Sequence, residues 1–198
     1  MMNDYKILYQ SVPNWDAVPG VELRHTGWLG ECPVRAWAKL CRDDAAFWVR
    51  MEAEEAPIRA TLTEPLDEVY RDSCLEFFLA PDPDDARYLN FEWNPLGNLY
   101  LGFGSTRPTR VRQIVGDKNE LFRPEPHFTE GGWGIVFCIP YDFIRNYFPD
   151  FEPSGEMAGN FYKCGDETEF PHYLSWMPMS TDTPDFHRRQ DFGRLFFE

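Results

Sequence analysis

Apolar and polar residues alternate with a period of two in several short stretches of the chain, the pattern of a strand with one buried face. In residues 47–52, Phe, Val and Met alternate with Trp, Arg and Glu. Residues 36–41 precede this stretch across an Arg-Asp-Asp turn, so the two stretches are predicted to form a hairpin. Residues 88–93 and 98–103 predict a second hairpin around Asn-Pro-Leu-Gly, whose Pro and Gly suit a type I turn.

Further strands are expected in the remaining apolar stretches, and one short helix is expected among them. Residues 74–79 are almost continuously apolar, which indicates a central strand, and residues 133–139 form the second arm of a strand pair around Gly-Gly. Residues 141–148 carry apolar side chains at helical spacing. Three more strands are predicted at residues 157–164, 172–177 and 193–197. The pattern therefore predicts an all-β protein, an antiparallel β-sandwich with one short helix.

The length and composition fit a single domain. A chain of 198 residues can bury roughly 70% of its unfolded surface, so it needs no disulfide or metal to hold its core. Seventeen Pro and 14 Gly disfavour long helices. We expect residues 1–198 to form one β-sandwich domain, with residues 1–30 as an irregular N-terminal segment that holds one strand at most.

Charge and cysteine usage bear on partners and location. The chain has 19 basic and 33 acidic residues, a formal net charge of −14, which disfavours nucleic acid and anionic membranes as partners. No apolar run approaches the ~20 residues of a membrane span. The start of the chain shows no signal-peptide pattern, and its five cysteines are odd in number with no Cys-x-x-Cys pair. These features predict free thiols in a cytoplasmic protein.

Sequence patterns for metal binding and nucleophilic catalysis are missing. The four histidines lie far apart and none belongs to a His-x-x-x-His arrangement. There is no Gly-x-Ser-x-Gly elbow and no phosphate-binding glycine loop. From the residues we therefore predict no catalytic residue, no metal site and no cofactor.

The strand at residues 88–93 places hydrogen-bonding groups on one face. Tyr88, Asn90 and Glu92 share that face, opposite an apolar face that ends in Trp93. A polar face with an aromatic ring suits a sugar, because hydroxyls need donors and acceptors while the C–H face of the sugar packs on a flat ring. The same alternation predicts that Trp93 is buried.

The other tryptophans in strand-like stretches differ in the position expected for them. Trp37, Trp48 and Trp133 are expected in the core. Trp176 alternates with Leu174, which favours the core, but Met-Pro ends the strand beside it and a tryptophan at a strand end can be exposed.

Glu76 lies inside an apolar strand, where a charge is costly unless it is paired or faces a polar cleft. It could form a salt bridge with an arginine on a neighbouring strand. It could also pair with Glu92 as the two carboxylates of a glycosidase, which lie ~5–5.5 Å or ~6.5–9.5 Å apart in the retaining and inverting mechanisms. The sequence leaves these alternatives open.

Six segments, taken in order, resemble the family 9 carbohydrate-binding modules best known from xylanases. They are similar to the family's Asp-Ser-x-Glu strand, the hairpin after it, the strand that leads to a short helix, the Gly-Phe-Asn strand, the Ser-Trp pair and the terminal Phe-Gly-x-Leu. In this chain they are residues 72–78, 88–97, 132–140, 159–161, 175–176 and 192–195. The resemblance implies a β-sandwich that holds a sugar between aromatic side chains.

The resemblance also implies particular site residues. Trp176 matches one of two tryptophans that clamp a saccharide end, and the other position falls on or near Tyr70. Glu76 matches a glutamate that contacts sugar hydroxyls, and Asn160 matches an asparagine near the site. Asn90 and Glu92 match the family's hydrogen-bonding positions approximately. Structural calcium is possible by the resemblance alone.

We therefore predict non-catalytic binding of a mono- or oligosaccharide. Tyr70 and Trp176 would be the aromatic platforms, and the four polar residues above would be the hydrogen-bonding groups. Two alternatives stay open: a small glycoside-active enzyme that uses Glu76 and Glu92, and a protein-interaction sandwich with a flat, exposed apolar patch.

Overall fold

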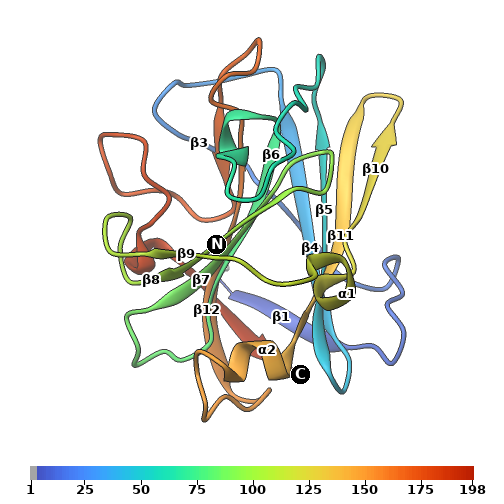
Figure 1. Cartoon of the computed structure of the whole chain (residues 1–198), viewed down its shortest axis with the longest axis vertical. Helices are drawn as coiled ribbons and strands as arrows, with labels where there is room; N and C mark the ends of the chain where they lie inside the picture. The colour runs from blue at the N-terminus through green and yellow to red at the C-terminus, as the bar shows by residue number, and fades with distance from the viewer. Residues whose placement is uncertain (1–3) are drawn as a thin grey trace.

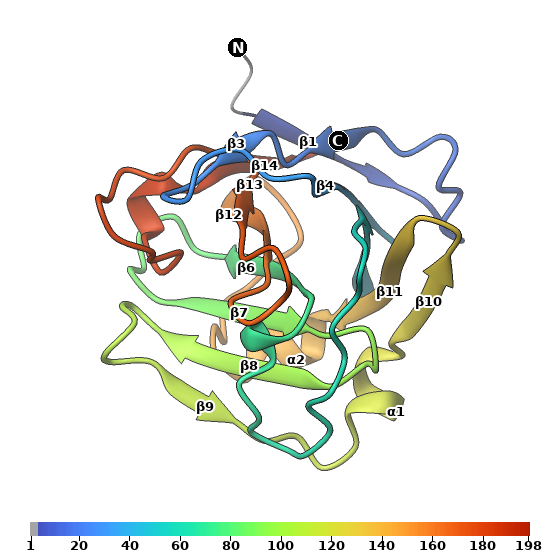
Figure 2. The ribbon, with the colours of Figure 1, turned by 90° about the horizontal axis from the view of Figure 1, so that it is seen from above.

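The computed structural model describes residues 4–198, whose strands form one strongly curled sheet that folds into two layers (Figures 1 and 2). The first layer has the order β10 (Glu125–Thr129), β11 (Gly132–Pro140), β5 (Ala46–Glu54) and β4 (Arg35–Arg42), with β2 (Gly20–Glu22) paired to β4. The second layer has the order β14 (Gly193–Phe197), β12 (Glu156–Cys164), β6 (Cys74–Ala80), β7 (Tyr88–Trp93), β8 (Leu99–Gly104) and β9 (Val111–Gln113). Beside β12 lie β13 (Tyr173–Ser175) and β3 (His25–Thr26).

The strand β1 (Asp4–Tyr9) joins the two layers. Its first residues pair in parallel with β14, and Leu8 and Tyr9 pair in parallel with β4. The other strand pairs of residues 4–198 are antiparallel. The predicted all-β sandwich is therefore confirmed, with the sheet mixed at β1.

Two short helices lie among the strands. The helix α2 (Tyr141–Arg145) falls within the predicted residues 141–148. A second helix, α1 (Lys118–Phe122), was not predicted; the Asp117 side chain caps it by accepting hydrogen bonds from the amides of Asn119 and Glu120. Two 3-10 turns, η1 (Val69–Arg71) and η2 (Arg189–Asp191), complete the helical elements of the described residues.

Residues 4–30, the described part of the N-terminal segment, are more regular than expected, since β1, β2 and β3 all lie within them. Two alternate residues of β1, Tyr5 and Ile7, are buried. This explains why the segment is fixed to both layers. Within residues 4–198, the structure contains no helix that is both long and apolar enough to cross a membrane.

The main core lies between the layers. It contains inward-facing residues of both, such as Val49 and Phe137 from the first layer and Phe77 and Phe91 from the second. Trp93 and Trp133 are fully buried there, which confirms both predictions.

Trp37 and Trp48 correct the expectation of a buried position, because both are only half-buried on the outer face of the first layer. Arg35 lies over the ring of Trp37, and the indole of Trp48 donates to Asp43 at 2.7 Å. Both tryptophans alternate with buried residues of the same strand, so the period of two places them outside.

The middle of the second layer, from β12 to β8, is buried on both faces. Its outer face carries a second apolar cluster with Phe78, Tyr88, Tyr162 and Phe186, which loop residues such as Trp28 help to cover. Every residue of β6 is consequently buried, which accounts for its nearly continuous apolar sequence.

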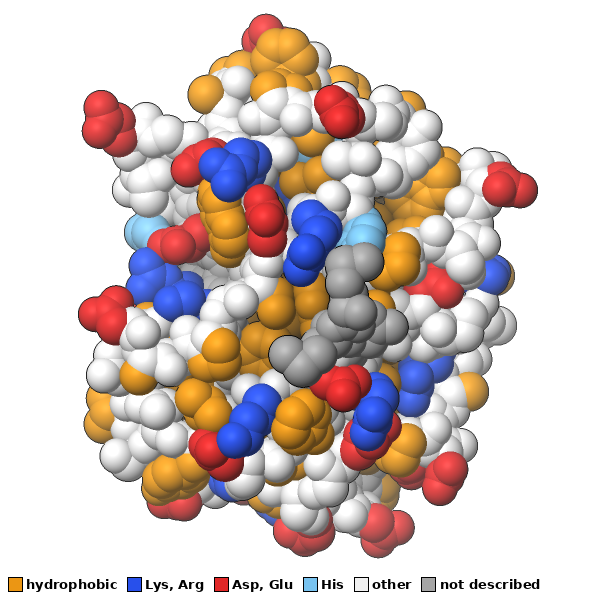
Figure 3. All heavy atoms as spheres, turned by 180° about the vertical axis from the view of Figure 1, so that it is seen from behind, with side chains coloured by type: hydrophobic (Ala, Val, Ile, Leu, Met, Phe, Trp, Pro, Cys, Tyr) orange, Lys and Arg blue, Asp and Glu red, His pale blue; other side chains and the backbone are white. Residues whose placement is uncertain are grey.

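All five cysteines are free, and four of them are buried. Acidic and basic side chains are interspersed on the face seen in Figure 3. Neither observation bears on where the protein resides, so the cytoplasmic location stays a prediction.

Candidate functional site

A cavity of about 200 Å³ opens on the outer face of the second layer, where β6, β7 and the end of β12 meet the surrounding loops. Aromatic and charged side chains line it together: Trp28, Tyr70, Tyr173, Phe186, Glu76, Glu92, Asp166, Asp185, Arg107, Arg110 and His187. A larger hollow of about 450 Å³ lies near α2, but its charged lining residues are exposed or half-exposed. The smaller cavity is therefore the better candidate, because buried polar groups converge on it.

Two glutamates form the floor of the cavity. Glu76 and Glu92 lie directly opposite each other on β6 and β7, and each is only 2% exposed. The Cys164 thiol donates to Glu76 Oε1 at 2.9 Å, and the Asn90 amide donates to Glu92 Oε1 at 2.9 Å. Polar partners thus satisfy one oxygen of each carboxyl group.

The environment favours the neutral form of both carboxyl groups. Burial raises the pKa of Glu76 to about 7. Burial also raises the pKa of Glu92 well above its ordinary value, and the neighbouring Glu76 adds to the shift. Within the described residues Glu76 has no salt bridge, and Arg110 approaches Glu92 only at 3.9 Å. The salt bridge considered for Glu76 is therefore not formed.

A histidine orients the arginine beside this floor. A guanidinium is always a donor, so the hydrogen bond from Arg110 to His187 Nε2 means that this nitrogen carries no proton. The proton of His187 then lies on Nδ1, which donates to the Tyr88 hydroxyl at 2.9 Å. Arg110 also donates to the Tyr100 hydroxyl at 2.9 Å. Burial and the positive charge of Arg110 lower the pKa of His187 to about 2, so the ring stays neutral.

Aromatic rings form the walls. Trp28 is half-buried, its ring centroid is 5.3 Å from that of Tyr173, and its indole donates to the Thr181 carbonyl at 2.8 Å. Its φ of +43° lies in the left-handed region, which costs energy for a residue with a Cβ. Tyr70 lies in η1, where its carbonyl accepts from the amide of Asp166 at 3.1 Å. Loop contacts thus hold the Trp28 ring and the backbone of Tyr70 at the cavity.

Buried Asp72 anchors the chain on both sides of η1. Its carboxylate accepts from the amides of Thr61 and Leu62, each at 2.9 Å, and from the Asn94 side chain at 3.0 Å. Arg59 also donates to it. These contacts hold the segment that carries Tyr70 against the end of β7.

The structure brings three of the predicted site residues, Tyr70, Glu76 and Glu92, to the cavity. Their part in binding stays a prediction. Asn90 is fully buried beneath them, where it supports Glu92. Asn160 is also fully buried, and its side-chain oxygen accepts from the amide of Met177 at 3.0 Å. The structure therefore corrects the direct hydrogen-bonding role expected for Asn90 and Asn160, since neither side chain lines the cavity.

Trp176 was wrongly assigned as an aromatic platform. It is 4% exposed and belongs to the core between the layers, where its ring lies 6.2 Å from Tyr5 and 5.9 Å from Phe161. Its side chain also covers Gly193, where a Cβ would lie 2.6 Å from the ring. The alternation that places Trp176 on the same face as buried Leu174 correctly predicted that its side chain points into the core.

Sequence reasoning missed Trp28, Arg107, Arg110, Asp166 and His187. Each lies outside the strands, where the period of two carries no information. A partial signal was present, because Trp28 and Phe186 are large aromatic residues in segments rich in Gly, Pro and Asp.

The fit of calcium can be tested on the residues themselves. Within residues 4–198, one group of three or more His, Cys, Asp or Glu donor atoms lies within 4.8 Å: Cys74, Glu76 and Cys164. Calcium takes six to eight oxygen ligands, so this group with two thiols does not fit it. Calcium therefore stays a prediction that rests on the family resemblance.

A β-sandwich whose outer face holds a cavity with aromatic walls and buried hydrogen-bonding groups defines a class of small-ligand binding proteins suited to sugars. The profile of carbohydrate-binding family 9 matches residues 14–197, and the chain belongs to this family. The resemblance seen in the sequence is thereby confirmed, and so is carbohydrate binding as the class of function.

Solved structures show the same fold. A protein of Bacteroides uniformis, to which carbohydrate binding is assigned by inference, is 24% identical to this chain. Its TM-score is 0.84, and the match covers 98% of this chain and 99% of that one. A family 9 module of Caldicellulosiruptor kristjanssonii in complex with cellotriose is 15% identical with a TM-score of 0.70, over 98% and 93%. The module from the same organism in complex with glucose is 15% identical with a TM-score of 0.68, over 98% and 95%. No curated protein matches the chain.

Proposed function

We propose that the cavity binds the end of a glucose-based oligosaccharide without cleaving it. Trp28 and Tyr70 are the aromatic platforms in this proposal, so Trp28 takes the role that the family resemblance assigned to Trp176. Glu76 and Glu92 are the hydrogen-bonding groups. A sugar ring placed between the walls would pack its C–H face on an aromatic ring and direct its hydroxyls to the floor.

The observation that carries the proposal is a pair of unsatisfied polar atoms on two residues that line the cavity. Glu92 Oε2 and Arg110 Nε are buried, and neither has a hydrogen-bond partner among the described residues. Leaving such groups unpaired costs about 1–3 kcal/mol each, so a ligand that supplied both a donor and an acceptor to them would recover this free energy. A sugar hydroxyl is such a group.

The glucose-based ligand is supported by the Caldicellulosiruptor kristjanssonii modules, which were solved with cellotriose and with glucose. At 15% identity these modules show only that the fold is shared, so the choice of sugar is part of the proposal.

The match to the family 9 carbohydrate-binding modules supports binding over hydrolysis. The enzymatic alternative predicts product release from chromogenic glycosides and its loss in Glu76→Gln. The binding proposal predicts no release.

Isothermal titration calorimetry with cello-, xylo- and manno-oligosaccharides tests the proposal. We expect a Kd between roughly mM and µM for cellotriose, about −4 to −8 kcal/mol. Trp28→Ala should weaken binding by at least about tenfold through loss of a stacking face. Trp37→Ala removes a half-buried tryptophan from the other layer and serves as the matched control. Absence of heat with every sugar, or equal effects of the two substitutions, would contradict the proposal.

A further inference from the structure

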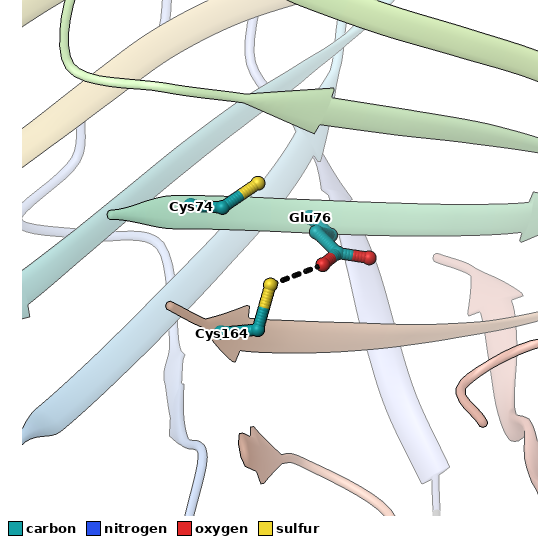
Figure 4. Close-up of side chains that lie close together, drawn as sticks. All are labelled: Cys74, Glu76 and Cys164. Atoms are coloured by element: carbon teal, nitrogen blue, oxygen red, sulfur yellow. Dashed lines mark hydrogen bonds between the residues drawn. The ribbon is translucent and has the colours of Figure 1, made fainter. Parts of the chain in front are cut away.

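Two cysteines and a glutamate converge at the inner end of the cavity. Cys74 on β6 lies directly opposite Cys164 on β12, and Glu76 follows Cys74 by two residues on the same face of β6. Figure 4 shows the carboxyl group of Glu76 turned toward the Cys164 thiol. One donor atom from each residue lies within 4.8 Å of the others, and all three residues are buried.

We propose that Cys74, Cys164 and Glu76 bind one zinc ion, with a fourth position open to the cavity. Two thiolates and one carboxylate are a donor set that zinc accepts, with Zn–S bonds of about 2.3 Å and Zn–O bonds of about 2.0–2.2 Å. Thiolate ligands select zinc over magnesium and calcium. This inference goes beyond saccharide binding and does not depend on it.

The arrangement of the strands supplies the rigidity that a metal site needs. The ligands come from two adjacent, hydrogen-bonded strands, so the backbone holds their relative positions.

An open coordination position follows from the burial of the three ligands. Glu76 and Cys164 line the cavity, whereas Cys74 lies behind them and is fully buried. An ion that reached the group through the cavity would have protein ligands on its inner side and the cavity on its outer side. Water or a ligand hydroxyl would fill the fourth position, as in zinc sites with three protein ligands.

Protons occupy the site when no metal is bound. Burial raises the pKa of the Cys74 thiol to about 12 and that of Cys164 well above its ordinary value, so both are protonated. The Cys164 proton lies in the hydrogen bond to Glu76 Oε1. Binding of Zn²⁺ releases both thiol protons to solvent, and the carboxyl proton where Glu76 holds one. The bound group has a net charge of −1, next to Arg110 in the cavity wall.

Cobalt substitution tests the proposal on the whole chain, reduced with a phosphine and freed of metal. Titration with Co²⁺ should give one equivalent of a complex with thiolate-to-cobalt charge-transfer absorption and tetrahedral visible bands, and Zn²⁺ should displace it. Cys74→Ser and Cys164→Ser should each weaken Co²⁺ binding by at least about 100-fold, since loss of a ligand exceeds the 10–100-fold effect of outer-shell changes. Glu76→Gln should weaken it while leaving both thiolate bands in place.

Cys138→Ser is the matched control, because Cys138 is buried in the first layer, where its thiol donates to the Leu121 carbonyl at 3.7 Å. This variant should bind Co²⁺ as the wild type does. Circular dichroism of each metal-free variant shows whether it is folded. If a cysteine variant does not fold, Glu76→Gln still tests the proposal. Absence of the charge-transfer band in the wild type, or its retention in folded Cys74→Ser, would overturn the proposal. Saccharide calorimetry on metal-free protein fails or succeeds independently of these results.

Discussion

Stability at mildly acidic pH should depend on His187. The ring donates a hydrogen bond to Tyr88 and accepts one from Arg110, and the accepted hydrogen bond requires the neutral form. Protonation would place an imidazolium against the guanidinium in a buried site. Burial and Arg110 accordingly lower the pKa of His187 to about 2, against about 6.5 for an exposed histidine.

The magnitude follows from proton linkage. Below pH 6.5 the unfolded chain binds a proton at this position that the folded chain does not, so the free energy of unfolding falls as the pH falls. Each pH unit between the two pKa values costs about 1.4 kcal/mol. At pH 4.5, two units below the pKa of the unfolded chain, proton uptake at His187 should make the free energy of unfolding about 2.7 kcal/mol lower than at pH 7.5.

Urea unfolding of wild type and His187→Gln at pH 7.5 and 4.5 measures this loss. Glutamine keeps a donor and an acceptor but does not titrate, so the variant should lose about 2.7 kcal/mol less than the wild type over this range. The matched control is His127→Gln, which changes a half-exposed histidine on β10 and should keep the loss seen in the wild type. Equal losses in wild type and His187→Gln would refute the reasoning.

Two further predictions concern buried groups. Trp176→Ala should lower the free energy of unfolding in urea by about 3–5 kcal/mol through lost packing and a cavity. An unchanged unfolding midpoint would contradict the buried position of Trp176. Lys163→Met should cost about 3–5 kcal/mol, because it leaves the buried Glu55 carboxylate without the positive charge that lies 3.0 Å from it. The double variant Lys163→Met/Glu55→Gln should recover part of this loss, and a double variant less stable than the single one would contradict that explanation.

The strands could be predicted from the sequence because one rule, the period of two, places their side chains. This rule put Trp93 in the core and Glu92 on the opposite face, as the structure shows. Applied strictly, it would also have placed Trp48 outside, since Trp48 alternates with buried Phe47 and Val49. For Trp176 the same rule was correct and the position taken from the family resemblance was wrong.

The parts that could not be predicted depend on contacts between distant segments. The parallel pairing of β1 joins residues 4–7 to the last strand of the chain, and no local pattern signals it. The cavity walls have the same origin. Trp28 and His187 reach the floor formed by Glu76 only because their loops fold over the second layer. Apolar periodicity says nothing about such loops.

The central claim is that a sugar binds in the cavity beside Trp28, and the indole N–H signals of the tryptophans test it most directly. We would assign these signals in ¹⁵N-labelled protein by single substitutions and titrate the protein with cellotriose. The signal of Trp28 should shift in proportion to saturation, while those of Trp93 and Trp176, both buried in the core, should stay in place. A shift of Trp176 without a shift of Trp28, or no shift at any tryptophan, would contradict the account.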